Sequence, residues 1–328
     1  MEVFLMEKEI AAPCLQGAMP PNKKLIRKSK PRKGRTLFIV CILAIPILNW
    51  LVFWLYVNIS SIFLAFQELD PWTGTEKWSL GNFEKFWEHI SGDGDLPLSL
   101  RNTGLYFLSG LLITMPLALF ISYFISKKIF GYQFFRVIFY LPCIITPVIL
   151  TSLYDQMLAP GGPIERLFSK LTWSYPQAGP LYKNGSMMPT MMIILYTILT
   201  GFGGDMLIFS GAMSRIPTEV YESAKLDGCG PIREVFTIVM PLIWSTISTK
   251  IVLLMSGIFA ASGPIMLLVT ENYETTTLSF WIFNSINSKD GSGDIHLVAM
   301  AGLCFTAIII PVIFGVRALM ERFGDVEY

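Results

Sequence analysis

The sequence has 328 residues, of which 53% are hydrophobic and only 15% are charged, and its formal net charge at pH 7 is +1. Soluble domains usually carry about 25% charged residues, and a chain of this length needs far more polar surface to stay in solution. The composition therefore excludes an ordinary soluble enzyme and predicts a protein that is embedded in a membrane.

Basic residues gather near the N-terminus, where nine of them precede the first long apolar run. This uneven distribution indicates membrane topology and not nucleic-acid binding, although residues 23–35 also suit a contact with anionic lipid head groups. The apolar run that follows has no convincing small-residue cleavage site, so we expect it to remain as a membrane anchor. Residues 1–36 are expected to form a cytoplasmic basic tail.

Six segments are long and apolar enough to cross a bilayer as helices, which takes about 20 residues each. Every one of them contains a proline, as kinked helices that line a cavity often do. The sequence predicts an all-α, polytopic membrane protein whose membrane domain covers residues 37–320 and is followed by a second cytoplasmic tail, residues 321–328. The six predicted spans are residues 37–60, 103–126, 137–154, 187–211, 241–269 and 296–317.

The lysine and arginine residues are divided unequally between the two sides of this domain. With both termini on the same side, seventeen basic residues fall on that side and seven fall in the three outer connections. Because cytoplasmic segments carry the excess of basic residues in membrane proteins, the sequence predicts that both termini are cytoplasmic.

Two charged residues, Asp205 and Lys250, interrupt the fourth and fifth predicted spans. A charge is costly in hydrocarbon unless it faces a cavity or another charge. At 1.5 Å per helical residue, both lie roughly 12 to 14 Å from the cytoplasmic boundary. Two interpretations remain open: the residues form a pair, or Lys250 extends toward the head groups while Asp205 faces water.

The connection between the fourth and fifth spans has the most informative local pattern. Pro217 suits the start of a helix, Glu219 lies near the positive end of the helix dipole, and Gly228 suits the left-handed residue just beyond the C-terminus. Either Asp227 or Gly230 then caps a second short helix. These residues predict a helix, a sharp turn and another helix at the cytoplasmic surface.

This connection resembles the membrane subunits of bacterial ATP-binding-cassette importers, whose signature is Glu-Ala-Ala, three residues, Gly, nine residues, Ile, one residue and Leu-Pro. The spacing is kept in full, with two mild replacements, at Glu222, Ser223, Ala224, Gly228, Ile238, Met240 and Pro241. The resemblance implies a type I importer permease (MetI-like) core, in which residues 214–241 couple the spans to a cytoplasmic ATPase. The coupling residues that it implies are Glu219, Glu222, Ser223, Ala224, Asp227 and Gly228.

Further motifs narrow the resemblance to permeases for maltose-type oligosaccharides or glycerol phosphate; they are residues 100–103, 134–142, 161–164 and 214–217. Residues 271–274, however, replace the family's usual Gly-Gly-Pro stretch. The resemblance implies a bacterial cell-membrane location, a sugar or oligosaccharide substrate, and three partners: a second homologous permease, a cytoplasmic ATPase dimer and an extracytoplasmic solute-binding protein. Tyr196, Asp205 and Lys250 are candidates for the substrate pathway, although Tyr196 is equally suited to anchoring at an interface.

Catalysis by this chain itself finds little support in the sequence. No Gly-rich phosphate loop with a following Lys-Ser or Lys-Thr occurs, so ATP hydrolysis is expected on a partner chain. Neither His89 nor His296 has a metal-ligand partner at a useful spacing, and no cofactor is predicted. A self-sufficient secondary transporter or channel remains an alternative, because it also combines kinked spans with intramembrane charges. A membrane-embedded enzyme would need a catalytic cluster at one face, and the sequence offers none.

Overall fold

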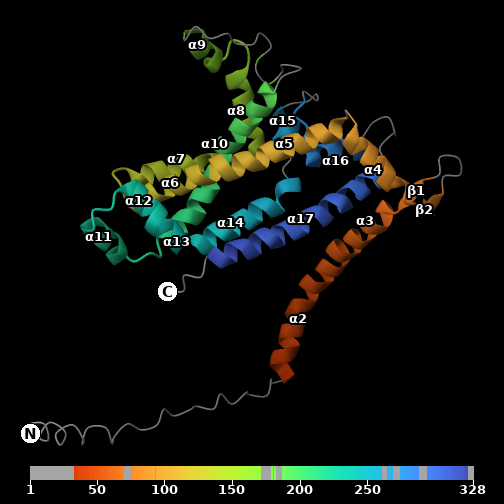
Figure 1. Cartoon of the computed structure of the whole chain (residues 1–328), viewed down its shortest axis with the longest axis horizontal. Helices are drawn as coiled ribbons and strands as arrows, with labels where there is room; N and C mark the ends of the chain where they lie inside the picture. Colours follow the sequence, from red (N-terminus) through yellow and green to blue (C-terminus); the bar gives the residue numbers. More distant parts are fainter. Residues whose placement is uncertain are drawn as a thin grey trace, which may run out of the picture. The chain divides into compact units, whose positions relative to one another are not determined.

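The structure is a computed structural model, drawn in Figure 1. It describes residues 33–69, 75–92, 94–170, 179, 181, 187–260, 264–268, 274–287 and 294–323. Most of the predicted basic tail, the departure at residues 271–273 and residues 324–328 lie outside the described residues. The chain divides into two compact units, Met1–Asn58 and Ile59–Tyr328.

The described part of the first unit is a single continuous helix that runs on into the second. α2 (Lys33–Asn49) passes through a π-helical segment, η1 (Trp50–Tyr56), into α3 (Val57–Ala65). Over Phe38–Ala65 this helix is long and apolar enough to cross a membrane. Its large apolar side chains are exposed along α2 and η1, as expected for a helix surrounded by lipid.

Among its described residues, the second unit contains three further helices long enough to cross a membrane. α5 (Asp95–Ser109), η2 (Gly110–Thr114) and α6 (Met115–Ser126) form one of them, and the others are α10 (Met188–Met213) and α17 (Ile295–Phe323). Figure 1 shows the α5–α6 helix as one long rod within this unit. These helices extend the predicted second and sixth spans beyond their expected bounds.

Two predicted spans are broken in the structure. α7 (Tyr132–Ile144) meets the helical segment Pro147–Leu167, which begins with α8 (Pro147–Leu158), at a bend of 101°. The sequence predicts one span there, over residues 137–154. The cause of the bend is Thr146, whose ψ of 138° is the extended conformation that a following proline imposes. If each bent pair counts as one span, the described helices supply up to six spans.

The predicted fifth span is the second broken one. α12 (Pro231–Glu234), η4 (Val235–Val239) and α13 (Met240–Leu242) bend by 78° into α14 (Trp244–Ser256), and η5 (Ile258–Ala260) and α15 (Ile265–Leu268) continue the chain. The break therefore lies near the start of the predicted span over residues 241–269.

A small substructure at one end of the second unit carries the two short strands, which are a minor addition to the predicted all-α fold. β1 (Gln67–Leu69) and β2 (Glu76–Trp78) pair antiparallel and lie beside α4 (Gly81–Ser91). The amide of Asn82 fixes the hairpin by donating to the Gln67 carbonyl over 2.7 Å. The Lys85 ammonium lies 2.7 Å from Glu68 and lowers the pKa of that carboxyl.

Asn102 and Thr103 organise the chain before α16 (Leu278–Ile286). The Asn102 amide donates to the carbonyl oxygens of Glu274 and Thr276 over 2.8 and 2.9 Å, and the Leu278 N–H donates to the Thr103 hydroxyl over 2.9 Å. The threonine run at 275–277 is fully buried as a result.

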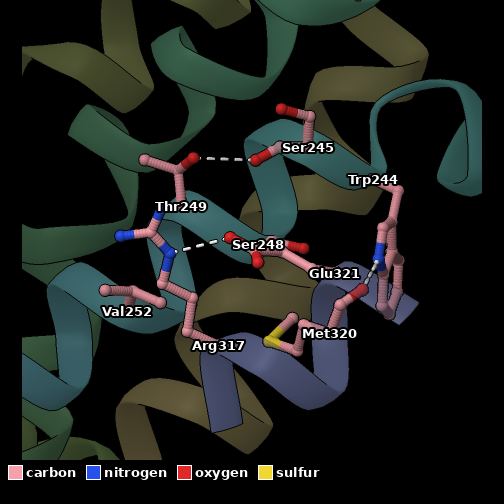
Figure 2. A pocket seen from close by; sticks show the side chains of 8 residues that line it. All are labelled: Trp244, Ser245, Ser248, Thr249, Val252, Arg317, Met320 and Glu321. Atoms are coloured by element: carbon pink, nitrogen blue, oxygen red, sulfur yellow. Dashed lines mark hydrogen bonds and ion pairs between the residues drawn. The ribbon is translucent and has the colours of Figure 1, made fainter. Parts of the chain in front are cut away.

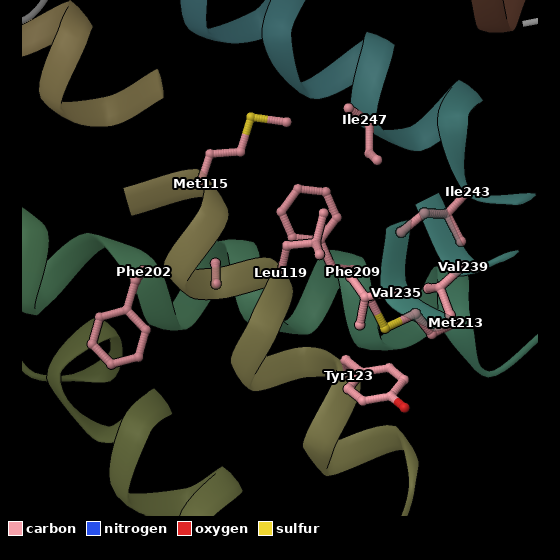
Figure 3. Close-up of a cluster of buried hydrophobic side chains, with 11 residues drawn as sticks. Met115, Leu119, Tyr123, Phe202, Phe209, Met213, Val235, Val239, Ile243 and Ile247 are labelled. Atoms are coloured by element: carbon pink, nitrogen blue, oxygen red, sulfur yellow. The ribbon is translucent and has the colours of Figure 1, made fainter. Parts of the chain in front are cut away.

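The largest buried cluster lies where α6, α10, η4 and α14 pack together, as Figure 3 shows. The Ser122 hydroxyl of α6 donates to the Met206 carbonyl of α10 over 2.9 Å. On the α7 side, a Cβ atom on Gly203 would lie 2.4 Å from the Phe139 carbonyl oxygen. Small residues therefore set the close approach of α10 to α7, a common device in membrane helix packing.

Candidate functional site

The connection between α10 and the broken fifth span folds into the predicted helix, turn and helix. α11 (Thr218–Leu226) begins one residue after Pro217, and α12 begins after Gly230, whose extended ψ of 160° suits an N-cap. Gly228 has φ 71°, as its place beyond the helix end predicts. The Cys229 N–H donates to the Ala224 carbonyl and the Gly228 N–H to that of Lys225, which is the Schellman pattern.

The predicted coupling residues, on α11 and in the turn just after it, differ in their exposure. Ala224 is buried, and the other five are exposed: Glu219, Glu222, Ser223, Asp227 and Gly228. The sequence reasoning missed Leu226, whose side chain is 90% exposed on the last turn. A highly exposed apolar side chain beside acidic residues is typical of a surface that contacts another protein. In the sequence, Leu226 could have been identified by its position between the matched motif residues Ala224 and Gly228.

A buried ion pair ties this connection to the end of α6. The Lys127 ammonium lies 2.5 Å from the Glu234 carboxylate, and Glu234 is only 3% exposed. The same ammonium lies over the ring of Tyr221, 4.1 Å from its centroid, and 5.5 Å from that of Tyr123. Burial, and next the nearby Glu234 charge, raise the pKa of Tyr221, so its phenol stays neutral. We call Lys127, Glu234, Tyr221 and Tyr123 the α6 anchor.

The α6 anchor joins the end of α6 to two consecutive helices that are remote from it in sequence. Tyr123 and Lys127 follow α6 to its end, Tyr221 lies on α11, and Glu234 ends α12. Removing either charge leaves the other in a largely buried place, where an unpaired charge is expensive. A displacement of α11 must therefore displace α6 or break the contact of the Lys127 ammonium with the Tyr221 ring. The sequence reasoning counted Lys127 only for topology and did not single out Glu234.

The second group of predicted residues lies within the helices. Asp205 of α10 and Lys250 of α14 form an ion pair, so of the two interpretations the paired one is confirmed. Their side chains are 15% and 21% exposed. Both line a cavity of about 250 Å³ between α5, η2, α10 and α14. The depth match along two helices was the sequence signal for this contact, although it left both interpretations open.

Tyr196 lies away from this pair. It is buried in the same hydrophobic cluster as Tyr106 and meets the ring of Tyr154 edge-on, with centroids 5.2 Å apart. Tyr106 lines the cavity in its place, and its buried hydroxyl makes no hydrogen bond with any described residue. The cavity thus contains a charge pair that is neutral overall. Such a lining suits an uncharged or weakly charged polar solute.

A wider hollow of about 610 Å³ lies between α14 and α17, near the same end of the unit as α13 (Figure 2). Serine and threonine side chains of α14 face it on one side. On the other side Arg317 and Glu321 of α17 form an ion pair at 2.8 Å. The Trp244 indole closes one edge by donating to the Met320 carbonyl over 3.0 Å.

Comparison with known proteins extends this description. A family model described as "Binding-protein-dependent transport system inner membrane component" matches residues 110–324. The diacetylchitobiose uptake system permease protein NgcF of Streptomyces coelicolor is 24% identical over 94% of this chain and 88% of its own length. The sn-glycerol-3-phosphate transport system permease protein UgpA of Yersinia pestis is 24% identical over 84% and 89%.

A solved structure is similar to this fold over most of its length. It is a bacterial alginate ABC transporter in complex with alginate pentasaccharide-bound periplasmic protein. One of its chains gives a TM-score of 0.75 at 19% identity, covering 90% of this chain and 98% of that chain. At that identity the likeness is one of fold.

Proposed function

The chain belongs to the family of binding-protein-dependent transport system inner membrane components, and from this premise we propose that it is the permease subunit of an ATP-driven importer for a sugar or oligosaccharide. The relatives named for uptake of diacetylchitobiose and of glycerol phosphate support a polyhydroxylated cargo. The neutral Asp205–Lys250 pair supports it as well, because it offers a polar solute both a hydrogen-bond donor and an acceptor.

The observation that carries the proposal is the exposed acidic and apolar face of α11, held to α6 from behind. Such a face suits docking on a separate ATPase, while the α6 anchor links any movement of α11 to the long α5–α6 helix. Closure of an ATPase dimer would then tilt this helix and expose the cavity to alternate sides. A second homologous permease and an extracytoplasmic solute-binding protein complete the proposed assembly.

The proposal places α11 and both termini on the cytoplasmic side. Basic residues support this orientation, because seventeen fall on that side and seven on the other. An ATPase bound through α11 requires the same orientation. Retention of the ATPase therefore tests the side and the partner together.

Two glycines in the turn after α11 provide a matched test of this function. Gly228 and Gly230 both have open space where a Cβ would lie, but only Gly228 has positive φ. Gly228→Thr forces a β-branched residue into the left-handed region at a cost of roughly 1–2 kcal/mol, and should misdirect α11. Threonine is about as good as glycine at an N-cap, so Gly230→Thr is the control.

The measurements are co-purification of the ATPase and the second permease with the tagged chain, and ATP-dependent uptake of labelled sugar. We expect the wild type and Gly230→Thr to retain both partners and to transport, and Gly228→Thr to lose most of the ATPase and of the uptake. If the two variants retain the ATPase and take up sugar equally, α11 does not have the proposed coupling role. Uptake by the chain alone, without any ATPase, would favour a secondary transporter or channel.

The Asp205–Lys250 pair provides a separate prediction about the substrate pathway. Asp205→Asn and Lys250→Met should each lower uptake severalfold, because each leaves one charge alone inside the membrane. The double variant should be less impaired than the sum of the two losses. Uptake kinetics and thermal unfolding are measured on all three. A raised KM in the double variant at wild-type stability places the pair in the pathway, whereas an unchanged KM gives it a structural role only.

A further inference from the structure

A third cavity, of about 610 Å³, lies between the end of α6, the start of α7, the end of α10 and α11. The cavity adjoins the α6 anchor, because Lys127 of that anchor also lines it. Its volume falls in the range of roughly 300 to 1,000 Å³ that is usual for sites that bind small molecules. The proposed transport cycle gives this cavity no role.

Positive charge dominates the lining of this cavity. Lys128, Arg136 and Lys225 all line it, and none of them forms an ion pair with a residue that the structure describes. Glu222 is the one carboxylate among the lining residues. Lys127 is already paired with Glu234. Three unpaired cations against one carboxylate leave the cavity with a surplus of two positive charges, which favours an anionic ligand.

Hydroxyl groups add donors among the cations. Tyr132 and Thr218 both line the cavity. The Tyr132 hydroxyl accepts a hydrogen bond from Gln133 over 3.2 Å, so its own hydrogen is left for another acceptor. Cationic groups combined with hydroxyl donors are the set that binds phosphate oxygens.

Apolar side chains beside the cavity distinguish a lipid from a free anion. Phe130, in the turn between α6 and α7, is fully exposed, and Phe134 on the first turn of α7 is 65% exposed. Both lie within a few residues of the cavity-lining Tyr132 and Arg136 in sequence. The same short segment therefore offers cations to a head group and aromatic rings to an acyl chain, as expected at a membrane–water boundary.

We propose that this cavity binds the phosphodiester head group of an anionic phospholipid, with Lys128, Arg136 and Lys225 as its cationic ligands. The lipid's acyl chains would lie along the exposed aromatic side of α7. A lipid held between α7 and α11 would brace α11 against α7. The site is independent of which sugar is carried.

The test counts the lipids retained by the full-length protein after extraction from nanodiscs, by native mass spectrometry. The nanodiscs contain phosphatidylcholine alone or with phosphatidylglycerol. The cavity variant carries Lys128→Gln, Arg136→Gln and Lys225→Gln. The control variant carries Arg215→Gln, Arg233→Gln and Arg322→Gln. These changes also remove three positive charges, but from residues that do not line this cavity.

We expect the wild type and the control to retain phosphatidylglycerol in preference to phosphatidylcholine. The cavity variant should bind it about fivefold more weakly for each charge removed, and so on the order of a hundredfold in total. Lys128→Arg with Lys225→Arg keeps the charges and should keep the lipid, which separates binding from misfolding.

Three results would overturn the proposal. In the first, the cavity and control variants retain equal amounts of phosphatidylglycerol. In the second, millimolar inorganic phosphate displaces the lipid, which would make this cavity a site for a free anion. In the third, the cavity variant keeps its lipid and loses the ATPase, so that the three cations face a protein partner.

Discussion

Lys127→Met is expected to destabilise the protein by about 3 kcal/mol or more, because it leaves the Glu234 carboxylate buried without a counter-charge. Glu234→Gln should cost less, since the Lys127 side chain is 25% exposed and can turn toward water, whereas that of Glu234 is only 4% exposed. The partner with the more exposed side chain is thus the more important one to keep. Thermal unfolding of the purified chain measures both losses.

The control for this prediction is Lys128→Met, which removes the neighbouring charge. Lys128 forms no ion pair with a described residue, so its loss should change stability by no more than about 0.5 kcal/mol. The double variant Lys127→Met with Glu234→Gln should recover part of the stability lost in Lys127→Met alone. Uptake should fall with stability, because α11 is then no longer held to α6. Equal effects of Lys127→Met and Lys128→Met would show that the anchor contributes nothing.

Gly203→Ala should have the second large effect. Its Cβ would lie 2.4 Å from the carbonyl oxygen of Phe139, a backbone atom that cannot rotate away. α7 and α10 would have to separate, and overpacking of this kind typically costs about 1–3 kcal/mol. We expect a lower yield of folded protein and a lower unfolding temperature.

Gly201→Ala is the matched control, two residues earlier on the same helix. A Cβ there meets nothing within 4 Å. Alanine in place of glycine should then stabilise the helix by up to about 1 kcal/mol. Opposite signs for the two alanine variants are the expected result. A neutral Gly203→Ala would mean that the two helices are not held as closely as the contact indicates.

The turn was predictable from sequence because it depends on short-range geometry. Pro217 and Gly228 restrict the backbone locally, so the helix and turn between them follow from residue type alone. Counting residues along two helices from one boundary placed Asp205 and Lys250 at equal depth, and the structure decides that they pair. Helix rise is constant enough for that count to be useful.

Other features depend on contacts that residue type does not specify. Glu234 lies in a charged connection and is typical there of a solvated residue, so its burial depends on how α12 packs against α6. The bend before Pro147 was predictable in principle, but a proline inside an apolar run is also compatible with a mild kink. Tyr196 looked like any other aromatic residue, and only packing against Tyr154 distinguishes it.

The contact between Asn102 and the chain before α16 has a consequence for biosynthesis. The Asn102 amide donates to the carbonyl of Glu274, which follows it by 172 residues. At roughly 5–20 residues per second, a ribosome adds that length in about 10 to 30 seconds. During this interval the second span is already made, yet its amide has neither of its final acceptors. The second span and the chain before α16 therefore come together only late in synthesis, and a chain that stops before residue 274 leaves Asn102 dependent on water.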